Sequence, residues 1–327
     1  MIPAPSPRRA SVVTHFWWST LVILGMTGSF PANVRGAEPE QRAIAFLARE
    51  VPAWSAEHRC FSCHNNGDGA RALFDARLRG WKVADGALTA TSAWLANPAG
   101  WRENGGDGPF SDRRLARLQF SLALAASVAS GNSQSRPALI VAAKELAADQ
   151  LEDGRWTIDG PEALGSPATY GTPLATWFAM DVLRQADETH FRTTIEKARS
   201  WLARLKPVTL LDGAAILFAG VGDRDAALSL IQTGQSDDGG WGPYSNSPPE
   251  PFDTAVVLIS LTRIHGPTPE IASRLRRGRA YLVATQGEDG AWTETTRPAG
   301  GESYAQRLST TGWATLALLA TSPKPPR

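Results

Sequence analysis

Residues 279–292 read Arg-Ala-Tyr-Leu-Val-Ala-Thr-Gln-Gly-Glu-Asp-Gly-Ala-Trp, an apolar helical stretch that ends in the pattern Gln-x-x-x-Gly-x-Trp. The same pattern occurs at Gln150–Trp156 and at Gln235–Trp241. Each copy lies between two stretches that carry apolar residues at helical spacing. A pattern that recurs between helices marks a helical repeat, and internal repeats decide an architecture before any local feature does.

Degenerate copies extend this repeat over most of the chain. Phe46-Leu47, Trp94-Leu95 and Trp201-Leu202 hold the place that Tyr281-Leu282 has in the last unit, and each precedes a break and another apolar helix. One amphipathic and one more apolar helix per unit predict six hairpins that close into a double ring, with the apolar helices inside. The first helices are predicted near residues 40–50, 86–97, 137–149, 190–205, 223–233 and 270–285, and the second helices near 67–79, 113–129, 169–186, 208–220, 252–265 and 304–320.

The unit that runs from Arg279 through Tyr281-Leu282, Gln286 and Gly290 to Trp292 resembles the QW motif of squalene–hopene cyclases and related triterpene cyclases. The resemblance covers residues 137–320 well and the rest more loosely. It implies an all-α, single (α/α)6 toroid over residues 37–323, a fold that protein prenyltransferase β subunits share. It also implies a structural role for the motif tryptophans. A fold does not fix an activity.

The resemblance further implies an acid motif, Asp-x-Asp-Asp, before the Thr-Ala that begins an inner helix. Here the matching stretch is Glu250-Pro-Phe-Asp-Thr-Ala255, so that Phe252 stands where the central, proton-donating acid belongs. Because Phe cannot hold or deliver a proton, we do not expect proton-initiated cyclisation. Asp253 is then either a helix N-cap or, together with Tyr170, a catalytic or pocket residue.

Cys60-Phe-Ser-Cys63-His64 contains the only two cysteines of the chain. Cys-x-x-Cys-His is the attachment signature of haem c, in which Cys60 and Cys63 bond the haem and His64 ligates its iron. Two alternatives stay open: a disulfide or thiol redox pair, and a zinc site made by Cys60, Cys63, His64 and His58. A distal haem ligand, if one exists, is Met180, His58, His190 or His265.

The six-hairpin order places this motif in the first connection from an outer to an inner helix. The Gln…Trp turns occupy the same connection in later units, so all of these loops are expected at one end of the ring. Tyr170, Asp212, Asp253 and Tyr304 begin inner helices at that end. The following Asn-Asn-Gly-Asp-Gly, residues 65–69, is interpreted as a tight turn with helix capping.

The first 36 residues predict a signal peptide. Arg8 and Arg9 precede an apolar stretch at residues 16–30, and Val34 and Gly36 are small enough for a cleavage site. The apolar stretch is short for a membrane span of about 20 residues, although an uncleaved anchor stays open. We therefore expect an exported, periplasmic or otherwise extracytoplasmic protein, in which cysteines can be oxidised or haem attached. Residues 324–327 are predicted to be a disordered tail.

Three functions are compatible with these features. The first is binding of an isoprenoid or other apolar lipid in a central cavity, next to Trp177, Phe178, Phe218 and Trp313. The second is electron transfer by covalent haem c, and the third is a non-enzymatic binding scaffold. The net charge of +1 gives no electrostatic footprint for nucleic acid. Catalysis, the oligomeric state and association with a membrane surface stay open.

Overall fold

The computed structural model describes residues 38–104, 113–158, 160 and 163–322, and these residues form helices and connecting loops without a strand. The predicted signal peptide and C-terminal tail lie outside the described residues. The helices are α1 (Pro39–His58), α2 (Ala70–Leu78), α3 (Thr89–Leu95), α4 (Arg113–Ala129), α5 (Arg136–Ala147), α6 (Thr172–Asp187), α7 (Arg192–Ala203), α8 (Leu210–Ala219), α9 (Arg224–Thr233), α10 (Pro251–Leu261), α11 (Pro269–Thr285) and α12 (Tyr304–Thr321), with a π-helix η1 (Cys63–Gly69) and 3-10 helices η2 (Pro98–Glu103) and η3 (Ser133–Ser135).

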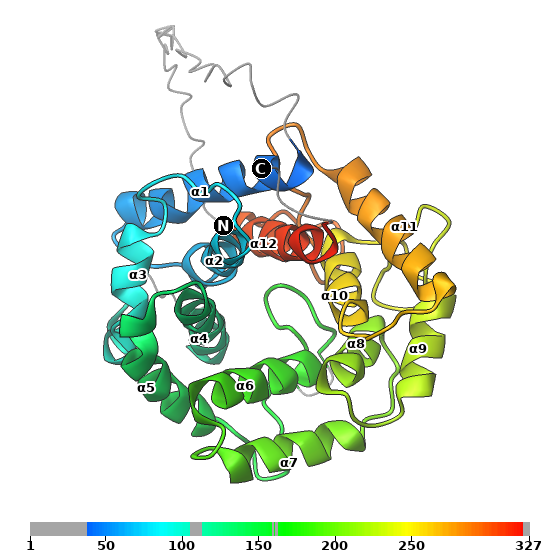
Figure 1. Cartoon of the computed structure of the whole chain (residues 1–327), viewed down its shortest axis with the longest axis horizontal. Coiled ribbons are helices and arrows are strands. Elements are labelled where there is room, and N and C mark those ends of the chain that lie inside the picture. The colour runs from blue at the N-terminus through cyan, green and yellow to red at the C-terminus, as the bar shows by residue number, and fades with distance from the viewer. Residues whose placement is uncertain (1–37, 105–112, 159, 161–162, 323–327) are drawn as a thin grey trace, which may run out of the picture. The chain divides into compact units, whose positions relative to one another are not determined.

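The helices form two concentric rings (Figure 1). Around the inner ring, α2, α4, α6, α8, α10 and α12 each contact the next helix, and α12 contacts α2, so the ring is closed. The outer ring consists of α1, α3, α5, α7, α9 and α11. The predicted (α/α)6 toroid is therefore confirmed, with helix bounds within a few residues of those predicted for most units. The first outer helix is the main difference, since α1 continues to His58.

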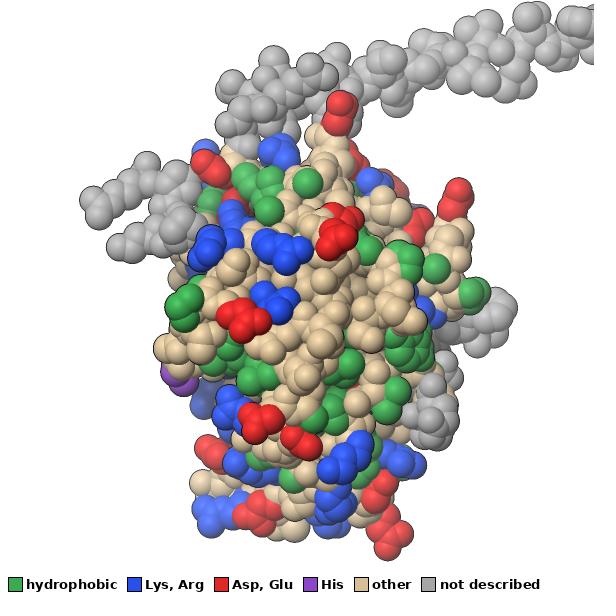
Figure 2. Space-filling model, turned by 90° about the vertical axis from the view of Figure 1, so that its right-hand side faces the viewer, with side chains coloured by type: hydrophobic (Ala, Val, Ile, Leu, Met, Phe, Trp, Pro, Cys, Tyr) green, Lys and Arg blue, Asp and Glu red, His purple; other side chains and the backbone are tan. Residues whose placement is uncertain are grey.

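Burial explains which helices lie inside. The inner helix α10 buries nearly every residue from Phe252 to Leu261, whereas the outer helix α7 fully buries only Ala198 and Leu202. A helix that is apolar on all sides needs neighbours on all sides, and a helix with one apolar stripe needs them on one. On the side of the ring where α9 and α11 lie, charges of both signs are interspersed (Figure 2). No helix among the described residues is long and apolar enough to span a membrane.

The Gln of each repeat joins two neighbouring units. Its side-chain amide donates to the carbonyl oxygen of the motif's own Gly and to a carbonyl oxygen in the first turns of the next outer helix. In the last copy these acceptors are Gly290, at 2.9 Å, and Pro39 of α1, at 3.0 Å. The last repeat therefore binds the first helix and closes the outer ring. The other two copies make the bonds Gln150–Gly154, Gln150–Thr194, Gln235–Gly239 and Gln235–Arg274.

The Gly and Trp of the motif have equally regular places. Gly290 has a φ of +92°, and a Cβ there would lie 2.4 Å from the carbonyl oxygen of Arg42 in α1. Only glycine permits both the left-handed backbone and this close approach. The indole N–H of Trp292 donates to the carbonyl oxygen of Leu282 at 2.8 Å. Trp156 and Trp241 make the same bond to the residue ten positions earlier, Leu146 and Ile231, also at 2.8 Å.

Polar residues cap several of the predicted helix starts. Thr209 and Asp212 form a capping box at the start of α8, and Ser303 accepts a hydrogen bond from the backbone N–H of Gln306 at the start of α12. These caps fix where the inner helices begin. All inner helices start at the same end of the ring, called the mouth below.

Candidate functional site

The cysteine motif forms a tightly held turn between α1 and η1 at the mouth. Arg59 adopts a left-handed conformation, with φ 55°, and ends α1. The Ser62 hydroxyl accepts hydrogen bonds from the backbone N–H groups of His64 and Asn65 and so caps η1. The side-chain amide of Asn104 bonds both the N–H and the carbonyl oxygen of Phe61. The backbone around both cysteines is therefore fixed from two sides.

No disulfide joins Cys60 to Cys63 in the described structure. Cys60 is 6% exposed, whereas Cys63 is partly exposed. The Nδ1 atom of His64 lies 2.7 Å from the hydroxyl oxygen of Ser309 in α12. Burial lowers the pKa of His64 to about 4, so the imidazole is neutral at ordinary pH. His64 thus has one ring nitrogen anchored by a hydrogen bond.

The predicted zinc ligands do not come together. His58 stacks on Trp54 with ring centroids 3.9 Å apart, and its Nδ1 lies 3.2 Å from the carbonyl oxygen of Trp54. In the described part of the chain, no three His, Cys, Asp or Glu side chains are grouped so that they could hold a metal ion. Of the other candidate distal ligands, Met180 is buried within α6, while His190 and His265 are exposed after the ends of α6 and α10.

The interpretation of residues 65–69 as a tight turn is wrong, because they form the buried π-helix η1. Side-chain hydrogen bonds hold this π-helix in place: the Asn66 amide donates to the carbonyl oxygen of Val51 at 3.1 Å and to the Thr91 hydroxyl at 2.9 Å. Gly67 is required here, since a Cβ would lie 2.8 Å from the Cβ of Gln119 in α4. π-helical turns are often found at functional sites.

This π-helix carries a buried carboxylate, Asp68, that is 1% exposed. The Tyr170 hydroxyl donates to its Oδ1, and the Gln119 amide donates to its Oδ2 at 2.7 Å. Burial raises the pKa of Asp68, although Tyr170, Ser309, Arg71 and Gln119 oppose the rise. We call His64, Asp68, Gln119, Tyr170 and Ser309 the central polar cluster. It connects the cysteine motif to the interior of the ring.

Tyr170 reaches this cluster because of an unusual backbone. It has a φ of 58° and is followed by Gly171 with a φ of 75°. The side chain of Tyr170 is completely buried. On the outer side, Tyr170 and Gly171 border a cleft of about 360 Å³ at the mouth, which Lys206, Asp212 and Tyr244 also line. Tyr170 therefore separates the described cleft from the interior, and its predicted position at the mouth is confirmed.

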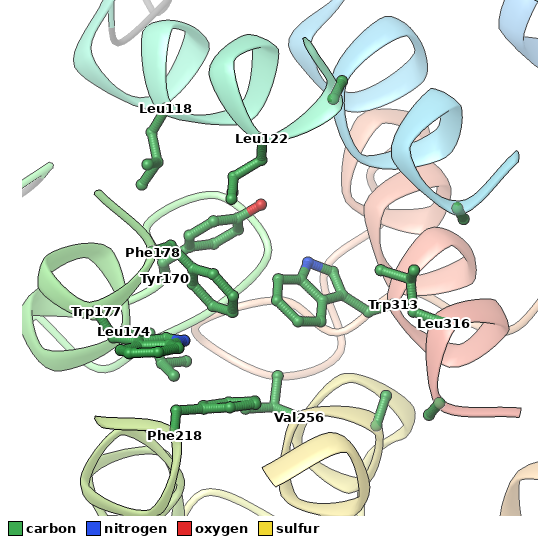
Figure 3. Packing of buried hydrophobic residues seen from close by; sticks show 14 of the residues in the cluster. Leu118, Leu122, Tyr170, Leu174, Trp177, Phe178, Phe218, Val256, Trp313 and Leu316 are labelled. Carbon is green, nitrogen blue, oxygen red and sulfur yellow. The ribbon is translucent and has the colours of Figure 1, made fainter. Parts of the chain in front are cut away.

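Aromatic side chains from three inner helices meet Tyr170 in the middle of the ring. Figure 3 shows the rings of Tyr170, Phe178, Phe218 and Trp313 pointing toward one another. The centroid of Phe178 lies 5.2 Å from that of Trp313 and 5.7 Å from that of Phe218, and Trp177 stacks on Phe218 at 5.9 Å. We call Tyr170, Trp177, Phe178, Phe218, Phe252 and Trp313 the aromatic centre. These side chains are at most 7% exposed.

Two cations lie against the aromatic centre within the described structure: Arg184, over the ring of Trp177 at 5.8 Å, and Arg71. The Arg71 guanidinium carbon is 4.7 Å from the ring centroid of Trp313 and 5.0 Å from that of Phe178. Aromatic faces attract such a cation. Arg71 is nevertheless only partly buried, although the two rings that it covers are almost completely buried. Part of Arg71 is therefore accessible to solvent beside the aromatic centre.

Asp253 is directed away from this centre. It is completely buried and pairs with Arg297 at 2.7 Å, and the same guanidinium also bonds Glu250. Burial raises the pKa of Asp253 to about 7 against the opposing charge of Arg297. The N-cap of α10 is Glu250, so the alternative that made Asp253 a helix N-cap is wrong. Phe252, by contrast, contacts Trp313 at 5.7 Å. The position nearest the centre therefore lacks an acid.

The two remaining mouth residues have structural contacts. Asp212 accepts hydrogen bonds from the N–H groups of Val208 and Thr209. Tyr304 is 43% exposed and donates to Glu50 at 2.9 Å. The structure thus connects His64 to Tyr170 through Ser309, Gln119 and Asp68. It leaves Asp253 in a separate ion pair.

Sequence reasoning missed Asp68, Arg71, Gln119 and Ser309 as parts of a site. These residues come from η1, α2, α4 and α12, and their contacts join positions up to 245 residues apart. One signal was available: a run of polar residues directly precedes an inner helix, where a buried position is expected. This signal does not show which residues the polar side chains contact.

Comparison with known proteins gives matches among solved structures only. No protein-family model matches it, and no curated protein does. Among solved structures, a protein from Actinoplanes aligns with a TM-score of 0.55 and 16% identity, covering 86% of this chain and 98% of that one. The type II terpene cyclase MstE from Scytonema aligns with a TM-score of 0.42 and 11% identity, covering 86% of this chain and 98% of its own. The first likeness supports the toroid fold alone, and the second is too low to carry an argument.

Proposed function

We propose that the protein binds an apolar small molecule of the isoprenoid class beside the aromatic centre. The observation that carries this proposal is the partly exposed residue Arg71, whose guanidinium lies over the buried rings of Trp313 and Phe178. Arg71 is a solvent-accessible residue next to an apolar, aromatic surface. Small-molecule sites are usually concave and apolar, with a few placed polar groups. The QW-like repeats agree with this proposal.

Proton-initiated cyclisation is not part of the proposal. Phe252 occupies the position nearest the centre in α10, and Asp253 pairs with Arg297. Asp68 is the remaining buried acid near the aromatic centre, but each of its oxygens already accepts a hydrogen bond, from Tyr170 and from Gln119. A carboxyl group used in this way is not free to protonate an alkene. Binding, rather than cyclisation, is what these residues support.

Binding can be tested with the purified full chain. Organic extraction followed by mass spectrometry would identify a co-purified prenyl lipid, and calorimetric titration with geranylgeraniol would measure affinity. Phe218→Leu removes a ring of the aromatic centre and should weaken binding about 2- to 10-fold, as expected for one aromatic contact. Phe191→Leu is the matched control, because Phe191 contacts the exposed His190 after α6. Failure to bind geranylgeraniol or any extracted lipid would overturn the proposal.

A second candidate function, covalent haem binding, is favoured by the anchored imidazole of His64. Haem-ligating histidines commonly hold one ring nitrogen in a hydrogen bond while the other binds the metal, and the His64–Ser309 contact has this form. Cys60 and Cys63, which form no disulfide in the described structure, would bond the haem. A bound haem would supply a one-electron redox couple. In this candidate the chain's own residues orient His64 and hold both thiols at the mouth.

The haem candidate has a direct test. The chain, with its N-terminal 36 residues retained, is co-expressed with haem-attachment machinery, and the exported protein is examined by absorption spectroscopy and intact mass. The mass of one haem is expected in the wild type and not in Cys60→Ala/Cys63→Ala. Export itself, predicted from residues 1–36, is read from the same fractionation. A wild-type mass without haem would refute this candidate, and a chain without haem or lipid would favour the scaffold function.

A further inference from the structure

Two hydrogen-bond donors beside the aromatic centre have no partner within the described structure. One is the Nη1 atom of Arg71, which is buried and makes no hydrogen bond. The other is the indole N–H of Trp313, a residue that is completely buried. Because buried donors are almost always satisfied in native proteins, each exception needs an explanation. The two lie together, since the guanidinium carbon is 4.7 Å from the Trp313 ring.

The contrast with the other tryptophans makes Trp313 informative. The indole N–H groups of the three motif tryptophans, Trp156, Trp241 and Trp292, all donate to a carbonyl oxygen at 2.8 Å. Their hydrogen bonds hold the repeats together. Trp313 is equally buried but has no structural acceptor, so its N–H is available for something that is not part of the chain.

The charged acceptor of the central polar cluster is already used, and the Oε1 atom of Gln119, which has no partner, is neutral. Asp68 accepts from Tyr170 through Oδ1 and from Gln119 through Oδ2. Among the described residues, no carboxylate lies within ion-pair distance of Arg71. The site therefore lacks a charged acceptor that can accept hydrogen bonds from a cation and from a second donor at once. A hydrocarbon offers none, and a carboxylate offers two oxygens that suit a guanidinium.

We propose that the ligand of the aromatic centre is an isoprenoid carboxylic acid, whose carboxylate accepts hydrogen bonds from Arg71 and Trp313 while its tail packs on the aromatic rings. This inference rests on the proposed function, since it specifies the chemistry of the same site. Placing a carboxylate there without Arg71 would be costly.

The experiment compares two ligands with the same tail, geranylgeranoic acid and geranylgeraniol, by calorimetric titration of the full chain. The acid is expected to bind at least about 10-fold tighter than the alcohol, as for a charge-assisted pair. Arg71→Gln should remove this preference, because it lowers the affinity for the acid more than the affinity for the alcohol. Arg77→Gln, on the exposed face of the same helix, is the matched control and should retain the preference.

The outcomes separate the two proposals. Equal binding of the acid and the alcohol, or an unchanged preference in Arg71→Gln, overturns the carboxylate inference and leaves the proposed function intact. Absence of binding by both ligands overturns the proposed function. If Arg71→Gln does not fold, Arg71→Lys retains the charge but loses the two-pronged geometry, and it should reduce the preference only in part. Trp313→Phe should also reduce it, through loss of the indole N–H.

Discussion

The side-chain amide of Gln286 donates a hydrogen bond to the carbonyl oxygen of Pro39, 247 residues away in the sequence, at 3.0 Å. This bond joins the last QW-like repeat to the first residue of α1. Arg42 of α1 in turn donates to Oε1 of Gln286, and Arg279 pairs with the buried Glu40 at 2.6 Å. The outer ring is thus closed by polar contacts between its two ends, in addition to apolar packing.

Gln286→Ala is therefore expected to destabilise the ring. The substitution leaves the carbonyl oxygens of Pro39 and Gly290 without this donor, at a cost of about 1–3 kcal/mol in the free energy of unfolding. Urea unfolding followed by circular dichroism measures the change. Gln134→Ala, at an exposed position, is the control and should stay within about 0.5 kcal/mol of the wild type. Equal stabilities for both variants would contradict a structural role for Gln286.

Gly290→Ala tests the close approach of the motif to α1. A Cβ at this position would lie 2.4 Å from the carbonyl oxygen of Arg42, whereas Gly300 has a similar φ, +84°, with no atom within 4 Å of its Cβ. Gly300→Ala should cost about 1–2 kcal/mol for the left-handed backbone alone, and Gly290→Ala should cost at least about 1 kcal/mol more through overpacking. Chemical unfolding of both variants gives the difference. Equal losses of unfolding free energy in Gly290→Ala and Gly300→Ala would mean that the contact with α1 does not contribute to stability.

The raised pKa of Asp253 predicts a pH dependence. Its value in the folded chain is about 7, against an ordinary 3.8, so between about pH 4 and 7 the folded state holds a proton that the unfolded chain has released. The free energy of unfolding then falls as the pH rises through this window. Asp253→Asn does not titrate there, so its stability relative to the wild type should increase from pH 5 to pH 8.

Arg297→Gln provides the complementary variant for this pair. The charge of Arg297 lowers the pKa of Asp253, so its removal should extend the decline in stability above pH 7. Unfolding in urea at several pH values follows both variants. If the free energies of unfolding of the wild type and Asp253→Asn changed equally with pH, the assigned titration would be refuted.

The fold was predictable because its signals repeat. Three copies of one motif locate outer-to-inner turns, and the apolar face of every unit tells inner helices from outer ones, so even the degenerate units could be placed. The candidate site offered no such redundancy. Asp68 meets Tyr170 only because η1 continues as a π-helix and Tyr170 takes a positive φ. Neither feature has a periodic signal, and a contact across 102 residues cannot be read from local spacing.

The pairing of Asp68 and Tyr170 predicts a strong coupling. Tyr170→Phe leaves Oδ1 of a buried carboxyl without its donor, and Asp68→Asn leaves the Tyr170 hydroxyl without a charged acceptor. A double-mutant cycle on the free energy of unfolding should give an interaction energy of about 0.5–3 kcal/mol, as for residues in one buried network. If the loss of stability in the double variant equalled the sum of the two single losses, the contact would contribute nothing to stability.

Unequal exposure of the two thiols predicts an order of modification in protein that carries no haem. Cys60 is 6% exposed, in a turn held by the amide of Asn104, whereas Cys63 is partly exposed. Since an alkylating reagent must reach the sulfur, iodoacetamide is expected to modify Cys63 before Cys60, as peptide mass spectrometry at short reaction times would record. Asn104→Ala frees the backbone of Phe61 and should speed the reaction of Cys60. The difference in alkylation rate between the two thiols should then become smaller. Faster labelling of Cys60 in the wild type would instead indicate that the turn opens in solution, and the rigid presentation of both thiols on which the haem candidate depends would then be lost.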